Sequence, residues 1–307
     1  YKHVLVHMLD ENMWRILEKH CERVKVTVWV HGAEIQAWQR RTFEFDRMTA
    51  DSIARQKKLS AKRLKFWRTV LNNVNVNLNL VFVSKTFMRE VESDLGVPLV
   101  RENVQVSVIH NYVDSRIFSY QEKTLQHRCK ILSVRSFASR KYGNDLTVAA
   151  ILELSKRPIF HELQFHIVGD GELYNETVLP LKKFSNVKLD RKFLTHRQIA
   201  ELQKDYGIFL NPTRWDSQGV SRDEAMSSGL VPITTSVAAI PEFVDMTCGV
   251  VVPAEDYVAI ADAIEFLYLN PNEFFRLSKA ASERVKEQCG FHKTINEEIR
   301  LIQKPSR

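Results

Sequence analysis

Cysteine is scarce in this sequence, and its four cysteines stand far apart, at Cys21, Cys129, Cys248 and Cys289. Because no Cys-x-x-Cys pair occurs, neither a zinc site nor a disulfide framework is expected. A reducing, cytoplasmic compartment is therefore the default. No apolar run reaches the roughly 18 residues that a membrane-spanning helix needs, and no charged-then-apolar leader is present.

The sequence patterns of a dinucleotide oxidoreductase and of an Asp-x-Asp metal site are also missing. A dinucleotide oxidoreductase would carry Gly-x-Gly-x-x-Gly after its first strand, and no such pattern occurs there. The shorter Gly169-Asp170-Gly171 lets the backbone approach a ligand closely, which is a weak signal alone. No Asp-x-Asp stands at the end of an expected strand, so no metal site is predicted.

The length of 307 residues suggests two domains, each with a core of its own. The net charge of +7 is uneven: residues 1–130 hold 22 Lys and Arg against 14 Asp and Glu, and residues 131–307 hold 22 against 23. Nucleic acid, an anionic membrane and a phosphorylated substrate all remain open as partners. Because the chain begins at Tyr1 and an apolar run starts at Val4, we expect that an upstream segment is absent from this sequence.

Short apolar runs alternate with helical patterns along the chain. Strands are expected at residues 4–6, 24–30, 78–83, 104–110, 130–134, 163–168, 187–189, 208–210, 230–233 and 250–252. Helices are expected at residues 11–21, 51–70, 86–95, 146–154, 220–228, 257–269, 273–288 and 293–303. This alternation predicts an α/β protein with parallel sheets covered on both faces. The polar, weakly patterned residues 115–127 are linker-like, and we place the domain boundary there.

The most informative stretch runs from Ile208 to Ser236. An apolar strand is followed by a polar loop that contains Asp216, and Gly219 then permits a tight turn into a short helix. Loops beyond the carboxyl ends of parallel strands are where ligands bind, and a helix N-terminus there favours an anion. Glu224 stands just over one turn inside the helix, where its carboxylate is able to accept hydrogen bonds from a sugar diol.

A pair of cations follows the strand at 130–134. Arg135 directly ends the strand, and Lys141 comes six residues later. Arginine grips phosphate with a fork and lysine supplies a compact charge, so the pair suits a diphosphate without an intervening metal. Arg140 is an alternative to Lys141. Two ordinary surface cations would be the simpler explanation, but the position of Arg135 at a strand end argues against it.

Residues 51–70 predict a basic amphipathic helix, with seven cations and one acid. Such a helix is able to lie on anionic lipid through Arg55–Arg68, although more often it packs its apolar stripe on its own domain. Nucleic-acid binding is not expected, because no recognition motif surrounds the helix.

The segment from Asp216 to Glu224, followed by Ala225-Met226-Ser227-Ser228-Gly229-Leu230-Val231-Pro232, resembles the carboxylate motif of retaining glycosyltransferases with the GT-B fold. The family that the segment resembles is glycosyltransferase family four, also called glycosyl transferases group 1. The family usually has Glu at both ends of the motif, so Asp216 is one methylene short. The family also pairs Arg with Lys, usually five residues apart.

Two further segments resemble the family. His110-Asn111-Tyr112-Val113-Asp114 is similar to its Asn-Gly-Val-Asp loop, with Tyr112 in place of glycine. Ala239-Ile240-Pro241-Glu242 is similar to its Gly-x-Pro-Glu segment, which implies that Glu242 braces the site loops.

The resemblance implies two Rossmann-like domains facing each other across a cleft. Residues 1–125 would form the acceptor-side domain, without the family's opening strand and glycine-rich loop. Residues 126–290 would bind the nucleotide-sugar, and the helix in 291–307 would cross back to the first domain.

The implied reaction is transfer of a hexosyl or N-acetylhexosaminyl group from a nucleotide-diphosphate sugar to an acceptor hydroxyl, with retention and without a metal or other cofactor. We expect a UDP-sugar rather than a GDP-sugar as donor and a saccharide or lipid-linked acceptor, in polysaccharide or glycoconjugate biosynthesis. The expected location is cytoplasmic, with peripheral contact to the inner face of the membrane as one option.

The resemblance also implies roles for particular residues. His31, at the end of a strand, would contact the donor sugar or acceptor, with His7 as a weaker second; a strand-end histidine bonded to a neighbouring carbonyl is the simpler explanation. Asp216 would hold the donor sugar and Glu224 the ribose. Phe193 would cover the base or belong to the core. The donor-binding set is Arg135, Lys141, Gly169, Phe193, Leu194, Gly219, Val220, Ser221 and Glu224.

A glycoside hydrolase needs two carboxyl groups facing one bond and has no use for phosphate-binding cations. A nucleotide-sugar epimerase on the same fold remains an alternative, and it would need acids and bases from both domains. A non-catalytic nucleotide-sugar-binding partner subunit also remains open, since Asp216 replaces the usual glutamate.

Overall fold

The computed structural model describes residues 3–20 and 22–303, so Cys21 lies outside the described residues. The chain divides into two compact units. The first consists of residues 1–111 and 294–307, and the second of residues 112–293. The expected α/β fold with two parallel sheets is confirmed.

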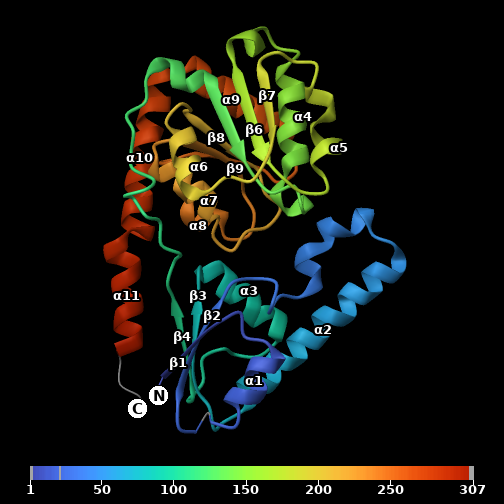
Figure 1. Ribbon diagram of the computed structural model, residues 1–307, viewed down its shortest axis with the longest axis vertical. Helices are drawn as coiled ribbons and strands as arrows, with labels where there is room; N and C mark the ends of the chain where they lie inside the picture. The colour runs from blue at the N-terminus through green and yellow to red at the C-terminus, as the bar shows by residue number, and fades with distance from the viewer. Residues whose placement is uncertain (1–2, 21, 304–307) are drawn as a thin grey trace. The chain divides into compact units, whose positions relative to one another are not determined.

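The first unit contains a four-stranded parallel sheet in the order β1-β2-β3-β4. The strands are β1 (His3–His7), β2 (Lys25–Val30), β3 (Asn77–Phe82) and β4 (Val104–Val108). Every residue of β2 is buried, as is typical of a strand covered on both faces. Figure 1 shows this sheet between α11 (Phe291–Gln303) on one side and, on the other, α1 (Glu11–Leu17), α2 (Ala50–Asn72) and α3 (Lys85–Leu95).

Helix α1 is shorter than predicted and ends at Leu17. After its cap, tighter backbone bonds such as the one from His20 N to the Leu17 carbonyl turn the chain away. A 3-10 segment, η1 (Trp38–Arg47), precedes α2 and carries no sequence signal that we recognised.

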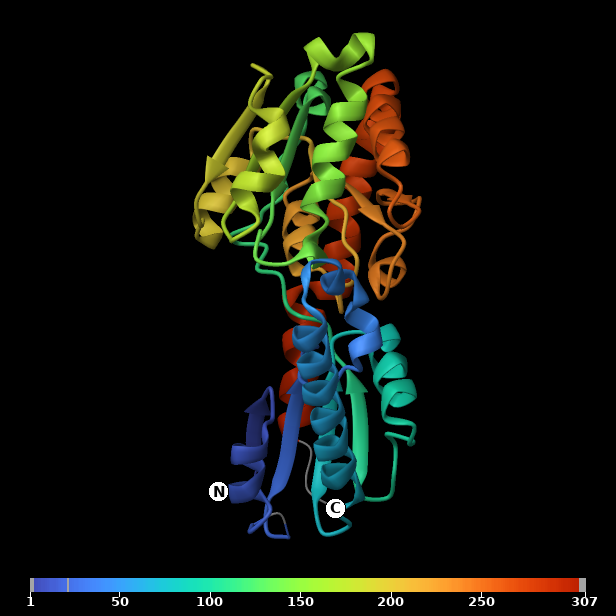
Figure 2. The same ribbon diagram turned by 90° about the vertical axis from the view of Figure 1, so that its right-hand side faces the viewer.

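Helix α2 packs its apolar stripe on its own unit. Leu64, Trp67 and Val70 are buried, and the Trp67 indole donates to the Glu34 carbonyl at 2.9 Å. Figure 2 shows α2 running along the face of the first sheet. Most of its cations are exposed, whereas Arg63 is half-buried and donates to the Ala33 carbonyl. None of the described helices is long and apolar enough to span a membrane.

The second unit contains a six-stranded parallel sheet in the order β10-β9-β8-β5-β6-β7. Its strands are β5 (Lys130–Val134), β6 (Gln164–Gly169), β7 (Val187–Arg191), β8 (Ile208–Asn211), β9 (Val231–Thr235) and β10 (Val250–Val252). The chain winds outward from β5 to β7, then returns and winds the other way from β8. The reversal lies between β5 and β8, where doubly wound sheets bind ligands beyond the strands' carboxyl ends.

Helices cover both faces of the second sheet (Figure 1). They are α4 (Asn144–Leu154), α5 (Tyr174–Val178), α6 (His196–Gln203), α7 (Val220–Ser227), α8 (Ile240–Phe243), α9 (Tyr257–Leu269) and α10 (Pro271–Cys289), with 3-10 turns η2 (Leu125–Cys129), η3 (Arg140–Tyr142), η4 (Pro158–Glu162) and η5 (Leu179–Leu181). Alternation along β5 sends Ile131 into the core with α4 and α9, and Leu132 into a smaller cluster with Ala225 of α7.

The stretch that we expected to be a linker is packed instead. Phe118 is buried with Met226 and Phe243, and the buried Lys123 donates to the Gln203 carbonyl at 3.0 Å. These contacts belong to the second unit, and the division into compact units therefore falls after Asn111, not near residue 125.

Candidate functional site at the carboxyl ends of β5 and β8

Arg135 stands at the point where the second sheet reverses. It follows β5 directly, and its side chain is only 6% exposed. Its Nη1 donates to the Ser221 hydroxyl in the first turn of α7 at 2.7 Å. Two of the predicted donor-binding residues, 86 positions apart, are thus brought together.

The remaining nitrogens of the Arg135 guanidinium are unusual. Nε and Nη2 are buried and have no hydrogen-bond partner among the described residues. Burial lowers the pKa of Arg135, and the charge of Asp216 opposes that shift; the ordinary value is so high that the group stays cationic. A buried donor without a partner costs about 1–3 kcal/mol, and more when charged, so the site is built for an acceptor that it does not itself contain.

Lys141 belongs to the same site. Its Nζ lies 4.7 Å from the centre of the Tyr142 ring and 5.9 Å from that of Trp215. The Lys141 carbonyl accepts from the Thr213 hydroxyl and the Arg214 N–H, both at 2.8 Å, which ties η3 to the loop after β8. Arg140, the alternative cation, has its guanidinium 3.3 Å from Asp145.

Arg214 braces this loop, a role that we did not predict. Its guanidinium donates to both carboxylate oxygens of Asp145 at 2.8 and 2.7 Å and to both of Glu255 at 2.8 and 2.9 Å. Arg214 therefore joins α4, the loop after β8 and the loop after β10. The three residues lie far apart in sequence, so no local spacing marks them.

Glycines allow the loops to approach each other. At Gly143, where φ is +62°, an added Cβ would lie 2.4 Å from the Pro212 carbonyl oxygen. At Gly169 it would lie 1.9 Å from the Arg135 carbonyl oxygen. The close approach at Gly169 is therefore to the chain's own backbone, and a contact with a donor there remains a prediction.

The N-terminus of α7 is open. Gly219 caps it with φ of +98° and supplies no side-chain cap. Arg222 and Asp223 donate their N–H groups to the Gly219 carbonyl at 3.0 and 3.1 Å. The N–H groups of Gly219, Val220 and Ser221 have no partner in the described part of the chain, as the donor-binding prediction requires.

A buried ion pair that sequence reasoning missed holds this turn. Arg222 donates to one oxygen of Asp223 through Nε at 3.0 Å and Nη2 at 2.6 Å, and also to the Gln218 carbonyl at 2.7 Å. The Gln218 amide donates to the other oxygen of Asp223 at 3.0 Å. Both charged side chains are fully buried, Arg222 at 0% and Asp223 at 1% exposed.

Glu224 is 7% exposed and has no hydrogen bond to its carboxylate among the described residues. Burial, with the charge of Asp223, raises the pKa of Glu224 to about 7. The nearest basic group is His196, whose Nε2 lies 3.8 Å from one carboxylate oxygen. A carboxyl group with unused acceptors at this edge fits the predicted bond to a sugar diol.

Asp216 lies in the loop between β8 and α7. Among the described residues, one hydrogen bond reaches its carboxylate, a long bond of 3.4 Å from the Gln218 N–H. Its charge acts on Arg135, but no ion pair of the described residues joins the two side chains. The carboxylate is thus near the cation without neutralising it.

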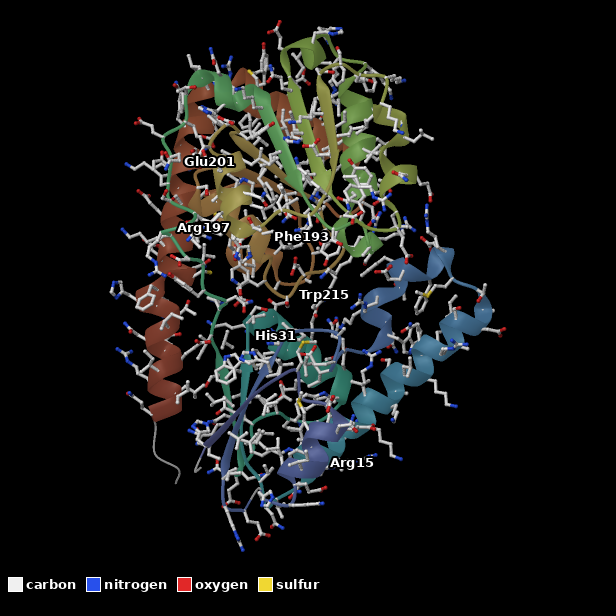
Figure 3. All side chains as sticks on the ribbon, viewed as in Figure 1. Arg15, His31, Phe193, Arg197, Glu201 and Trp215 are labelled. Carbon is white, nitrogen blue, oxygen red and sulfur yellow. The ribbon has the colours of Figure 1, made fainter. Side chains whose placement is uncertain are left out.

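Phe193 follows β7 and is 88% exposed (Figure 3). The alternative that it belongs to the core is wrong, because almost no protein atoms cover the ring. Leu194, the next residue, does pack on the smaller core cluster. Lys192 donates its N–H to the Gly169 carbonyl at 3.2 Å, so this loop lies beside the loop after β6. Thr195 caps α6, and its hydroxyl accepts from Gln198 N.

His31 belongs to the first unit, at the end of β2 (Figure 3). Its Nε2 lies 3.0 Å from Nδ1 of His7, and the two rings stack. The Glu34 carboxylate accepts from the N–H groups of His31 and Gly32, which fixes the turn. One partner of the His31 ring is therefore another imidazole. Burial lowers the pKa of His31, although the charge of Glu34 opposes this shift. The lowered pKa favours a neutral ring.

A groove of about 600 Å³ lies beside this turn, within the first unit. Leu9, Leu59 and Phe66 give it apolar walls, and Arg63 and Glu34 give it polar edges. The Arg63 guanidinium donates through Nη1 to the Ala33 carbonyl and forms no ion pair among the described residues. No group of three or more acidic, histidine or cysteine side chains in the described ranges is arranged to hold a metal ion.

Residues 128–270 match the sequence model of glycosyl transferases group 1, and this range contains β5 to β10 and the loops described above. The second unit is a group 1 glycosyltransferase domain. No curated protein matches the sequence.

Solved structures match both units. Sucrose-phosphate synthase from Thermosynechococcus elongatus is 17% identical with a TM-score of 0.76, over 98% of this chain and 73% of that one. WaaG, a glycosyltransferase involved in lipopolysaccharide biosynthesis, is 15% identical with a TM-score of 0.69, over 95% and 80%. A TarM variant of S. aureus is 14% identical with a TM-score of 0.68, over 92% and 51%, so this chain spans about half of it. These likenesses show the GT-B fold.

Proposed function

We propose that the protein transfers a sugar from a nucleoside-diphosphate sugar to an acceptor hydroxyl, with retention at the anomeric carbon. The observation that carries the proposal is the guanidinium of Arg135, which is buried with two unpartnered nitrogens next to the open N-terminus of α7. A diphosphate supplies the charge and the acceptor oxygens that both features lack.

Arg135 and Lys141 then stabilise the leaving group. As the bond between the anomeric carbon and the diphosphate oxygen breaks, negative charge grows on the diphosphate. Cations held in place before the reaction stabilise that charge without reorganising. Because two cations already stand at the site, we propose that transfer needs no metal.

The other predicted residues bind the remaining parts of the donor. Glu224 accepts hydrogen bonds from the ribose hydroxyls, and Asp216 with the N–H groups of Gly219, Val220 and Ser221 binds the sugar. The exposed ring of Phe193 stacks on the base. We favour uridine because TarM and the pneumococcal O-GlcNAc transferase GtfA were both solved in complex with UDP.

The first unit is proposed to serve the acceptor. Its groove combines the apolar ring of Phe66 with the hydrogen-bonding groups of Arg63 and Glu34, a lining that suits a saccharide with one apolar face. His31, held in a pair with His7, is proposed to contact the donor sugar or the acceptor.

The acceptor is proposed to belong to a cell-surface glycoconjugate, because the structurally similar WaaG is involved in lipopolysaccharide biosynthesis. The exposed cations of α2 within Arg55–Arg68 would then attract the protein to an anionic membrane surface on the cytoplasmic side.

The test is a thermal-shift panel of UDP, GDP and ADP, followed by an assay for UDP release from UDP-glucose and UDP-N-acetylglucosamine. Stabilisation by one nucleotide and sugar-dependent release are expected. Stabilisation without release would favour the partner-subunit alternative. Release of an epimerised free sugar would favour the epimerase. No stabilisation by any nucleotide would contradict the proposal.

A further inference from the structure

The ring of Tyr142 contacts both cations of the proposed diphosphate site. The guanidinium carbon of Arg135 lies 4.9 Å from the ring centre and Nζ of Lys141 lies 4.7 Å from it. Both distances are within the range in which an aromatic face attracts a cation. One side chain thus links a residue at the end of β5 to a residue in η3.

The backbone around Tyr142 is held firmly. Ser139 caps η3 by accepting from Lys141 N at 3.0 Å, and the Lys141 carbonyl is bonded to the loop after β8. Directly after the ring, Gly143 packs against Pro212 so closely that no Cβ fits. The ring is half-buried, so its position is set by the loops on either side of it.

Apart from the ring of Tyr142, the side chains of Arg135 and Lys141 have few contacts within the described chain that would fix their positions. Arg135 has one hydrogen bond from its guanidinium to the described residues, and Lys141 has no ion pair among them, so neither is oriented by a carboxylate. A carboxylate would orient them but would also cancel the charge that a diphosphate needs. An aromatic face holds cations in place and leaves their hydrogen-bond donors free.

We propose that Tyr142 is a positioning residue, whose ring face sets Arg135 and Lys141 for the diphosphate before it binds. The role rests on the proposed function. Holding two long side chains in advance reduces the ordering that binding would otherwise require. The ring face is the part that acts, and the phenolic hydroxyl is not needed.

The test replaces Tyr142 by phenylalanine and then by mono-, di- and trifluorophenylalanine. Fluorine keeps the shape of the ring and withdraws the negative charge from its face. We expect Tyr142→Phe to bind UDP within about twofold of the wild type, and the dissociation constant to rise with each fluorine to roughly tenfold. Titration calorimetry measures the affinity, and melting temperatures of the unliganded variants establish that they are folded.

Phe184 provides the matched control, because Lys183 lies over its ring at 4.9 Å outside the proposed site. The same fluorine series at Phe184 is expected to leave UDP affinity unchanged. A flat series at position 142 in protein that binds UDP would overturn the role of Tyr142 alone. If neither UDP nor inorganic pyrophosphate binds the wild type, the proposed function and the role of Tyr142 both fall.

Discussion

Nη1 of Arg135 donates a 2.7 Å hydrogen bond to the hydroxyl of Ser221, which joins the end of β5 to the first turn of α7. The bond crosses the point where the strand order reverses. It uses one guanidinium nitrogen and leaves Nε and Nη2 buried without partners in the described chain. The protein therefore carries a local energetic cost at the position where the account places the diphosphate.

That cost predicts opposite effects of one substitution on stability and on binding. Arg135→Leu removes the buried unpartnered charge, so the free energy of unfolding without ligand should stay the same or rise by about 1 kcal/mol. The stabilisation by UDP should disappear. Urea unfolding with and without UDP measures both. A large loss of stability in the unliganded variant would mean that Arg135 is a structural brace.

Alanine substitutions at two glycines with nearly the same φ angle distinguish the cost of backbone strain from the cost of steric crowding. Gly96, the cap of α3, has φ of +66° and open space around its missing Cβ, whereas Gly143 has φ of +62° and Pro212 against it. Gly96→Ala should cost about 1 kcal/mol, the price of the left-handed conformation. Gly143→Ala should cost at least about 3 kcal/mol, because the loop must also move. Equal losses in urea unfolding would contradict the packing described here.

Much of the fold could be predicted from the sequence. Lys130–Val134, Val250–Val252 and Tyr257–Leu269 have the predicted bounds, because the length and residue types of each apolar run distinguish a strand from a helix. The strand ending at Arg135 and the helix following Gly219 were likewise predicted from local signals. That both segments lie at the ligand-binding edge then follows, because parallel α/β sheets bind ligands beyond the carboxyl ends of their strands.

The contacts that support the site could not be predicted in the same way. The bonds of Arg214 to Asp145 and Glu255 join three loops distant in sequence, and the ring of Tyr142 reaches Arg135 only once β5 and η3 are folded. Sequence periodicity reports which residues are buried and not which partners they find. The exposure of Phe193 is another example, since neither its residue type nor its neighbours distinguished a core ring from a solvent-facing one.

The pH dependence of the free energy of unfolding should include a contribution from the titration of Glu224. Its pKa is about 7 in the folded protein against an ordinary 4.5, because of burial and the charge of Asp223. Between these values the unfolded chain has released the proton and the folded protein retains it. Stability should therefore fall as pH rises from about 4.5 to 7, by at most about 3 kcal/mol, and level off above 7.

Glu224→Gln should remove this part of the slope, and Glu201→Gln, at an exposed helix position, should leave it. Urea unfolding of the three proteins at several pH values makes the comparison. An unchanged slope in Glu224→Gln would assign the titration to another group.

The brace at Arg214 should matter for the fold of the site loops. Arg214→Met removes its four carboxylate hydrogen bonds, and because Asp145 and Glu255 are partly exposed, we expect a loss of about 2 kcal/mol. Arg197→Ala, on the exposed face of α6 (Figure 3), should change stability by less than about 0.5 kcal/mol. Similar values for both variants in chemical denaturation would show that the Arg214 network contributes no stability.

The most direct measurement is titration calorimetry of UDP into the wild type, Arg135→Leu and Arg140→Gln, in buffer containing a chelator. We expect one UDP per chain in the wild type, similar affinity in Arg140→Gln, and at least about a hundredfold weaker binding in Arg135→Leu, because a charge-assisted phosphate contact is lost. Equal affinity in Arg135→Leu and the wild type would contradict this expectation.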